Sequence, residues 1–434
     1  LLILLVCASA CPAWSQTVGL PQTPNTQVGD VQYIYSSSQL EVLQRSGQAL
    51  VDWATFSIGQ GGTVHFKQPG AQSLIINRVT GTQASVIEGS LLGNGQVWLL
   101  NPNGVLINES GRVNTQSFLA STHALSSESL SNSFRLNGSS KGAIQVLGQI
   151  EVSDGGSVVL QAPRIEVDGQ VRAKMGRIVY TSSNELALNF DGDGLLSFQL
   201  DQSNSPGRIS HKGQTLADGG QVIVSATTVQ NVMGSVIQLD GLLQANSLDT
   251  RTGQLVVDAG QQGAVQLSGR LEVKGLDAGS KGGQVSVAGS SLELTSTANL
   301  DASAQAAGGT LHVGGGWRGE VRQVAGLGPL NSSDLVVVKP GAVLRANALD
   351  SGRGGEVVLY ANTLNKASQL DFKGAIEAKG DLGGGRVETS AALMNLPGSV
   401  QAGQGGEWLI DPLDVVIGST ASASGTTTTL SASA

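Results

Sequence analysis

Short apolar runs separated by turn-forming residues are the main pattern of this chain. Runs of three to six residues rich in Val, Ile and Leu occur at 97–100, 105–107, 158–160, 177–180, 222–224, 255–257, 285–287, 335–338 and 357–360. Gly, Asn, Asp and Ser stand between them, which is typical of strands joined by tight turns. Beyond the N-terminal apolar run, helical periodicity appears only weakly, at 39–54 and 115–130. The pattern therefore predicts an all-β protein.

A repeated phrase accompanies these predicted strands. A pair of glycines precedes a β-branched run at 155–156, 219–220, 282–283, 308–309, 354–355, 384–385 and 405–406. The steps between the pairs are 64, 63, 26, 46, 30 and 21 residues, and most lie near multiples of 21 to 23. A second phrase of alternating apolar residues ends in Gly at 165–169, 271–275 and 376–380. A period of this size indicates a repeat architecture.

This period predicts a right-handed parallel β-helix. A coil of about 22 residues holds two or three short strands, and stacked coils share one apolar column with a rise of about 4.8 Å per coil. The predicted mature chain would then form about 19 coils and a rod of about 90 Å. Short strands outside the helix are expected near the N-terminus. A β-propeller is the alternative, although its blades would need a period of about 40–45 residues.

Composition and charge exclude several other classes. Gly contributes 60 of 434 residues, and 13% of residues are charged. So much Gly opposes a helical protein, because each Gly weakens a helix by about 1 kcal/mol. The net charge of −8 is spread along the chain without a Lys/Arg cluster, which opposes a nucleic-acid partner.

The first residues have the features of an export signal. Residues 1–6 are apolar, and residues 13–15 place small side chains at the −3 and −1 positions of a cleavage site. We therefore predict that 1–15 is part of a signal peptide, with a buried strand or a lipoprotein signal at Cys11 as alternatives. Both cysteines lie in this segment, so the predicted mature chain has no disulfide. No later apolar run reaches the roughly 18 residues of a transmembrane segment.

The most informative block, 53–112, ends in the tight turn Asn101-Pro102-Asn103-Gly104. Pro102 presets φ at the first central position, Asn103 suits the second, and Gly104 permits a positive φ at the exit. Asn101 can close an Asx hydrogen bond to the turn. Strands are expected on both sides, so the chemistry alone predicts a corner of the solenoid.

The ordered phrases of this block resemble the secretion domain of two-partner secretion exoproteins, the filamentous-haemagglutinin-like family. The phrase Asn77-Arg78-Val79 followed by the Asn-Pro-Asn-Gly turn carries the resemblance, which covers 30–265. Residues 405–412 are similar to the region before the passenger in high-molecular-weight adhesins of this group. The Asn-Pro-Asn-Leu motif of the other branch is replaced by Gln-Pro-Gly-Ala at 68–71, which places the chain nearer the adhesin branch.

The resemblance implies a route and a partner. Such an adhesin is exported through the periplasm and recognised by an outer-membrane β-barrel transporter with periplasmic docking domains of the POTRA type. It then folds outside, as an extracellular or surface protein of a Gram-negative bacterium, where host-cell receptors or glycans would be further partners. The candidate residues for transporter recognition or early folding are Asn77, Arg78, Asn101, Pro102, Asn103 and Gly104. The sequence leaves these two roles open.

Four segments follow from these expectations. The signal peptide at 1–15 precedes a secretion, or haemagglutination-activity, domain at 16–265. Residues 266–418 continue the β-helix with Gly-Gly repeats, and 419–434 form a Ser/Thr/Ala-rich tail that is typical of a linker.

The sequence predicts no catalytic, metal or cofactor site. Residues 314–319 fit G-x-G-x-x-G, but Gly and Pro at 326–329 oppose the helix that a nucleotide site requires. Residues 191–194 begin like a calcium loop and then depart from it, which indicates a surface turn. The four histidines, His65, His123, His211 and His312, lack the spacing of metal ligands.

We therefore expect a protein that is not an enzyme. Two alternatives remain open. A β-helix polysaccharide-degrading enzyme would need Asp with Arg or Lys gathered on one exposed face. The stem of a contact-dependent toxin would carry a toxic domain beyond this chain.

Overall fold

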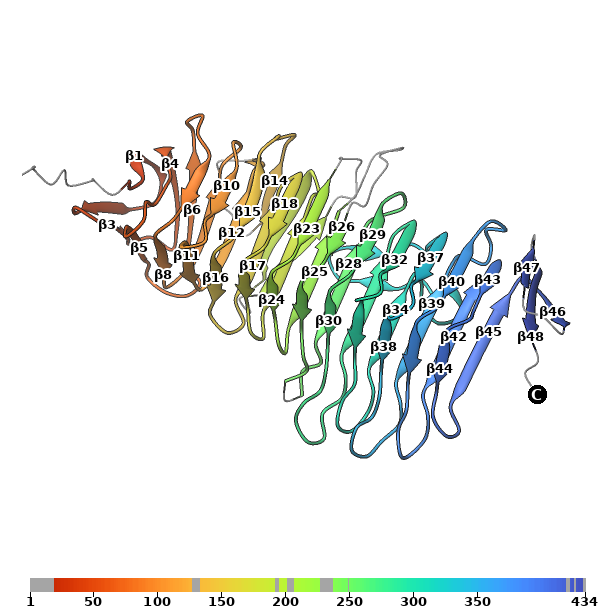
Figure 1. The fold of residues 1–434 in the computed structure, drawn as a ribbon. Coiled ribbons are helices and arrows are strands. Elements are labelled where there is room, and N and C mark those ends of the chain that lie inside the picture. Colours follow the sequence, from red (N-terminus) through yellow and green to blue (C-terminus); the bar gives the residue numbers. More distant parts are fainter. Residues whose placement is uncertain are drawn as a thin grey trace, which may run out of the picture.

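Three long sheets form the faces of a rod, which runs from the N-terminal to the C-terminal end in Figure 1. This computed structural model describes residues 19–126, 133–191, 195–200, 207–226, 237–248, 250–418, 422–424 and 427–431. The predicted signal peptide at 1–15 and residues 192–194 of the suspected calcium loop lie outside the described residues.

Sheet A has 14 strands and provides the first strand of each coil. Its order along the rod is β1 (Gln22–Val28), β4 (Gln48–Thr55), β6 (Leu74–Val79), β9 (Gln96–Leu100), β12 (Ser117–Ser121), β17 (Ser157–Gln161), β20 (Arg177–Thr181), β25 (Gln221–Ser225), β28 (Gln254–Asp258), β31 (Gln284–Ala288), β34 (Thr310–Val313), β39 (Glu356–Tyr360), β42 (Arg386–Ala391) and β45 (Glu407–Pro412).

Sheet C has 11 strands and follows sheet A in each complete coil. It comprises β7 (Ser85–Ile87), β10 (Val105–Ile107), β15 (Ala143–Val146), β18 (Arg164–Val167), β23 (Arg208–His211), β26 (Ile237–Leu239), β29 (Ala264–Leu267), β32 (Ser291–Leu294), β37 (Leu335–Val338), β40 (Gln369–Phe372) and β43 (Leu393–Asn395).

Sheet B has 14 strands and leads back to sheet A. It comprises β2 (Val31–Tyr35), β3 (Gln39–Gln44), β5 (Thr63–Lys67), β8 (Ser90–Gly93), β11 (Arg112–Thr115), β16 (Gln149–Val152), β19 (Gln170–Arg172), β24 (Gln214–Leu216), β27 (Leu242–Gln244), β30 (Arg270–Glu272), β33 (Asn299–Asp301), β38 (Val343–Arg345), β41 (Ala375–Glu377) and β44 (Ser399–Gln401).

The predicted parallel β-helix is confirmed, because each strand pairs in parallel with its equivalents in the coils before and after, except at the N-terminal end. The antiparallel pairings of β1 with β4 and of β2 with β3 close that end, as the expectation of extra strands there requires. A propeller is thereby excluded, since its blades would be antiparallel.

The predicted number of coils was wrong. Without β1, the 14-stranded sheet A gives thirteen coils in the described residues, not about 19, and a rod of about 60 Å. The step of 46 residues from Gly308 to Gly354 is one coil enlarged by an excursion, whereas the sequence suggested two coils. Insertions between strands leave the stacking intact, so step lengths alone miscount the coils.

The Gly-Gly pairs occupy the corner between sheet B and sheet A. A Cβ at Gly309 would lie 2.2 Å from the carbonyl oxygen of Gly283 in the preceding coil, and one at Gly355 would lie 2.0 Å from that of Gly309. Only glycine allows this approach, which explains the repeat. The second phrase is not a single structural repeat, because 165–169 begins in sheet C whereas 271–275 and 376–380 begin in sheet B.

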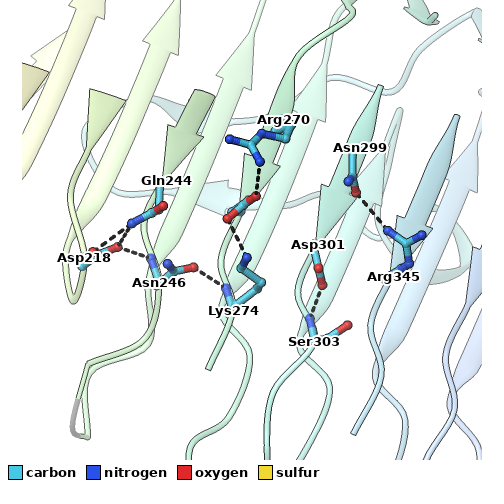
Figure 2. A network of polar contacts seen from close by, with 10 residues as sticks. Asp218, Gln244, Asn246, Arg270, Lys274, Asn299, Asp301, Ser303 and Arg345 are labelled. Carbon is cyan, nitrogen blue, oxygen red and sulfur yellow. Dashed lines mark hydrogen bonds and ion pairs between the residues drawn. The ribbon is translucent and has the colours of Figure 1, made fainter. Parts of the chain in front are cut away.

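Polar side chains also join successive coils on the side of sheet B, as Figure 2 shows. Asp218 accepts hydrogen bonds from Gln244 Nε2 at 2.9 Å and from the backbone N–H of Asn246 at 2.9 Å. Asn246 Oδ1 in turn accepts the N–H of Lys274 in the next coil at 2.8 Å. These bonds satisfy backbone groups of the long corner loops, which have no strand partner.

One apolar core fills the space between the three sheets, from Leu20 to Met394. Aromatic rings close its N-terminal end, where Trp53 meets Tyr33 and Phe56 edge-on with ring centroids 5.6 and 5.4 Å away. A second apolar cluster covers the outer face of sheet A.

Elements outside the coils cover the second cluster. A four-stranded sheet of β13 (Ala124–Leu125), β14 (Ser133–Asn137), β21 (Glu185–Asp191) and β22 (Leu195–Leu200) inserts Phe134 against Trp98, with ring centroids 5.1 Å apart. Farther along, residues 314–334 contain η1 (Trp317–Gly319), β35 (Gln323–Val324) and β36 (Gly328–Pro329). Part of the predicted tail forms β47 (Ser422–Ser424) and β48 (Thr427–Ser431), which pair beside β46 (Asp414–Gly418).

Among the described residues, no helix has the length and apolar character needed to span a membrane.

Candidate functional site

The Asn-Pro-Asn-Gly turn joins β9 to β10 and has the geometry that the sequence predicts. The N–H of Gly104 donates to the carbonyl oxygen of Asn101 at 3.1 Å, and the N–H of Asn103 donates to Asn101 Oδ1 at 2.9 Å. The second bond is the predicted Asx interaction. Gly104 has φ +117°, and a Cβ there would lie 2.9 Å from the carbonyl oxygen of Ala143. The predicted need for glycine is therefore confirmed.

The Asn101 side chain connects this turn to the preceding coil. Its Nδ2 donates to the carbonyl oxygen of Gln83 at 2.9 Å and to Ser85 Oγ at 3.0 Å. Its backbone N–H donates to Ser121 in the following coil at 2.9 Å. Because Asn101 is 0% exposed, it acts as an internal joint between three coils.

Asn77 makes a second buried joint, inside the rod on β6. Its Oδ1 accepts the indole N–H of Trp53 at 3.0 Å, and its Nδ2 donates to the carbonyl oxygen of Trp98 at 3.0 Å. Asn77 is therefore paired to the coils on both sides and is 0% exposed. A buried amide that is paired in this way specifies register, since a shifted strand would leave it unpaired.

Arg78, the next residue, points to the other face of β6 and holds Asp52 of β4. Its Nε donates to Asp52 Oδ1 at 2.6 Å and its Nη2 donates to Oδ2 at 2.9 Å. This two-point geometry is stronger than a single contact, although both side chains keep partial contact with solvent. The pair ties the coil of β6 to that of β4.

The six predicted residues thus occupy one region but not one surface. Asn77, Asn101 and Gly104 are buried, whereas Pro102 and Asn103 are exposed at the tip of the turn. Asn103 Nδ2 donates to the carbonyl oxygen of Gly81 at 2.9 Å, so the tip is also anchored to the preceding coil.

Sequence reasoning missed Gln68, which begins the stretch that replaces the Asn-Pro-Asn-Leu motif. Its backbone N–H and carbonyl oxygen both pair with the side-chain amide of Asn94, each at 2.8 Å. Its Nε2 donates to the carbonyl oxygen of Ser73 at 3.0 Å. Gln68 is buried and stabilises the corner before β6. The Pro-Gly dipeptide after Gln68 was the available signal of a corner.

A polar groove lies where sheet C turns into sheet B. Its floor is formed by the two-residue turns of successive coils, and it is lined by Glu109, Asp168, Lys212, Asp240 and Arg270, among others. The enzyme alternative requires carboxylates of this kind near basic groups. The three carboxylates lie on alternate coils, roughly 10 Å apart along the rod, so none is directly paired with another.

The histidines do not gather into a metal site. Within the described parts of the chain, no group of three or more His, Cys, Asp and Glu residues could hold a metal ion. His211 is buried on β23 and its Nε2 bonds Thr215 Oγ1 at 2.9 Å; burial lowers the pKa of His211 to about 4. Residues 314–319 form a loop with a short 3-10 turn and do not open a helix, as expected from the Gly and Pro residues at 326–329.

Comparisons with known proteins agree with this architecture. Two heme/hemopexin-binding proteins of Haemophilus influenzae are 29% and 28% identical over 268 and 300 residues, covering 59% and 63% of this chain. The chain spans only 29% and 31% of the length of these relatives. The crystal structure of the HMW1 secretion domain from Haemophilus influenzae matches with a TM-score of 0.75 and 25% identity, covering 90% of this chain and all of that one.

A family model described as the TPS secretion domain matches residues 22–273, more than half of the chain. This family consists of secretion domains and is not an enzyme family. Its exoproteins interact with an outer-membrane transporter and are secreted to the outside or the surface of Gram-negative bacteria. The chain therefore belongs to the TPS secretion domain family and contains the secretion domain of a two-partner secretion exoprotein.

Proposed function

We propose that buried residues in the region of the Asn-Pro-Asn-Gly turn serve folding, whereas exposed residues of the turn serve transporter recognition. Asn77, Asn101 and Gly104 would serve folding, because their bonds and close contacts all lie within the rod. The exposed Pro102 and Asn103 would serve transporter recognition. The observation that carries this proposal is the burial of Asn101 directly beside the exposed tip.

A strand edge offers a second contact for the transporter. β2 ends sheet B, so one of its edges has no strand partner among the described residues. On β2, Ile34 is 46% exposed and Tyr35 is 44% exposed. POTRA-type docking domains would add a strand to this edge, a common mode of recognising extended segments.

The secreted protein would be an adhesin or haemagglutinin-like protein that binds host-cell receptors or glycans through regions beyond this domain. The resemblance to adhesins and the HMW1 match support this proposal. We propose no catalytic role for the domain, because the family that it belongs to consists of secretion domains and is not an enzyme family. Incubating the purified domain with a panel of acidic and neutral polysaccharides should release no reducing ends, and any release would reopen the enzyme alternative.

The proposed boundary between the secretion domain and its β-helix continuation does not coincide with a structural boundary. Residue 265, the proposed end of the secretion domain, lies inside β29, and all three sheets continue past it. Residues 266–418 would then extend the rod toward the passenger, with 1–15 as the signal peptide and 419–434 as the linker.

Secretion of residues 16–265, with and without the transporter, tests the proposal. Release should require the transporter, and Asn101→Ala and Asn103→Ala should both leave protein in the periplasm. Refolding of the purified variants separates the tasks: Asn101→Ala should refold several-fold more slowly, whereas Asn103→Ala should refold normally but bind the transporter's periplasmic domains weakly. Normal release of both variants would overturn the assignment, and equal refolding of both would overturn the division.

A further inference from the structure

Residues 314–334, here named the flap, leave the rod after β34 and return to it at β37. The N–H of Gly314 donates to the carbonyl oxygen of Val287 at 2.8 Å, so the flap begins by contacting the preceding coil. Val324, Leu327 and Leu330 of the flap belong to the apolar cluster outside sheet A, together with Ala288 of β31. The second half of the flap is therefore held by ordinary apolar burial.

The first half of the flap is held by a chain of polar contacts instead. Arg322 Nη1 lies 2.9 Å from His312 Nδ1, and His312 Nε2 lies 2.7 Å from Glu356 Oε1. Arginine can only donate, so Nδ1 must accept and the proton must sit on Nε2. His312 is 2% exposed, and this neutral tautomer satisfies both of its ring nitrogens.

Two further contacts hold the first half of the flap against the rod. Arg386 of β42 pairs with Glu356, and its guanidinium lies 4.7 Å from the ring centre of Trp317 in η1. The backbone N–H of Arg318 donates to Glu388 Oε2 at 2.6 Å. The first half of the flap therefore has no buried apolar anchor of its own, since Trp317 is only partly buried.

A second proton on His312 cannot be accommodated in this arrangement. It would point an N–H at the permanently charged guanidinium of Arg322 and remove the acceptor. The charged groups around His312 are Glu356 and Arg386 on the rod and Glu320 and Arg322 on the flap. Glu356 would favour the imidazolium, but it is also shared with Arg386. The hydrogen bond from His312, together with the charges of Arg386 and Arg322, holds the pKa of Glu356 below its usual range.

We propose that the first half of the flap, residues 315–322, is a pH-sensitive latch that closes over sheet A when His312 is neutral and is released when His312 is protonated. Release exposes the outer faces of β34 and β39, while Val324, Leu327 and Leu330 keep the second half in place. Imidazole is the side chain whose ordinary titration falls between about pH 5 and 8. A narrow cavity lies beside His312 and Ser286, and the buried Oγ of Ser286 has no partner among the described residues. This inference does not depend on how the domain is secreted.

Amide hydrogen exchange of the whole chain at pH 7.5 and pH 5, corrected for the intrinsic rate at each pH, tests the latch. Peptides covering 315–322 should exchange at least about tenfold faster at pH 5, whereas those covering 324–330 should change little. A peptide covering 96–121 reports whether the rod remains folded. Equal corrected rates for 315–322 at both pH values would overturn the proposal.

Matched variants identify the titrating group. His312→Gln can still accept from Arg322 and donate to Glu356 but cannot gain a proton, so its exchange at 315–322 should be slow at both pH values. Arg322→Gln removes the repelling charge and should flatten the pH dependence even if His312→Gln folds poorly. Acceleration at pH 5 that persists in both variants would assign the effect to Glu388, whose pKa is raised by burial, and would overturn the role of His312.

Discussion

The leading and trailing coils of the rod differ in the polar side chains that they bury, although glycine corners occur in both: a Cβ at Gly89 of the leading coils would lie 2.2 Å from the carbonyl oxygen of Gly62. In the leading coils, β3 to β10, the buried polar side chains are neutral: amides and hydroxyls such as Gln68, Asn77 and Asn101. In the trailing coils, from β23 onward, corners are closed by stacked glycines, and ionisable side chains such as His211, Asp258 and Glu388 are buried.

The leading coils therefore carry contacts that are unique to each coil, whereas the trailing coils repeat the same contact from coil to coil. Each buried amide of the leading coils has partners that no other coil supplies, so it selects one register and one neighbour. The glycine corners of the trailing coils are interchangeable, because each needs only the carbonyl group of the coil before it. A domain that must start folding at a defined place would carry its unique contacts at the leading end.

The largest expected effect comes from the leading aromatic cap. Trp53→Ala removes a fully buried ring that contacts Tyr33 and Phe56 and leaves Asn77 Oδ1 unpaired. We expect the free energy of unfolding of the leading coils to fall by about 4 kcal/mol. Chemical denaturation, monitored by hydrogen exchange of peptides from the leading and trailing coils, measures the loss of stability at each end. A loss shared equally by both ends would contradict the expectation that the leading coils depend on contacts of their own.

Adding a side chain at a glycine corner of the trailing coils should destabilise the protein nearly as much as Trp53→Ala does. Gly309→Ala places a Cβ 2.2 Å from the carbonyl oxygen of Gly283, so two coils must separate locally. We expect a loss of about 3 kcal/mol, because the obstacle is backbone and cannot rotate away. Gly70→Ala is a matched control: its Cβ meets nothing within 4 Å and, like Gly309, Gly70 has no positive φ, so it reports the replacement of a glycine without the clash. Equal losses in both would disprove the packing explanation.

Buried charge should make the trailing coils respond to pH. Burial raises the pKa of Asp258 from 3.8 to about 6, so its contribution to stability is present below pH 3.8 and is lost as the pH rises to 6. Asp258→Asn should therefore unfold with a free energy higher by up to about 3 kcal/mol at pH 7 and unchanged near pH 4. Urea denaturation at both pH values measures this, and a gain of the same size at pH 4 would exclude titration as the cause.

The smallest of these effects on stability should come from the leading corner. Asn101→Ala leaves the carbonyl oxygen of Gln83, Ser85 Oγ and the N–H of Asn103 without a partner, at a cost of about 2 kcal/mol. Asn101→Asp keeps the size and the acceptor to Asn103, but it turns a carboxylate oxygen toward the carbonyl oxygen of Gln83 at a buried position, so at neutral pH it should destabilise at least as much as Asn101→Ala in thermal denaturation. An Asp variant as stable as wild type would show that the donor bonds contribute little.

The fold and the corner turn were largely predictable because both depend on local chemistry. Short β-branched runs between turn residues predict stacked strands, and Asn-Pro-Asn-Gly predicts its own hydrogen bonds. The coil count was not predictable, because excursions such as the flap lengthen a coil without changing the stacking of its strands. The exposure of the six site residues also required the structure, since adjacent strand residues such as Asn77 and Arg78 face opposite sides.

By itself, the sequence determined the repeated strand, the glycine corners and the family, because each depends on short stretches of consecutive residues. Only the tertiary structure decided which side chains from different coils meet, such as Asn77 with Trp53, Gln68 with Asn94 and His312 with Glu356, and that Arg322 of the flap returns to His312. The physical reason is that coils bring together residues 20 to 46 positions apart at a spacing of about 4.8 Å, and insertions shift that correspondence without leaving a local signal.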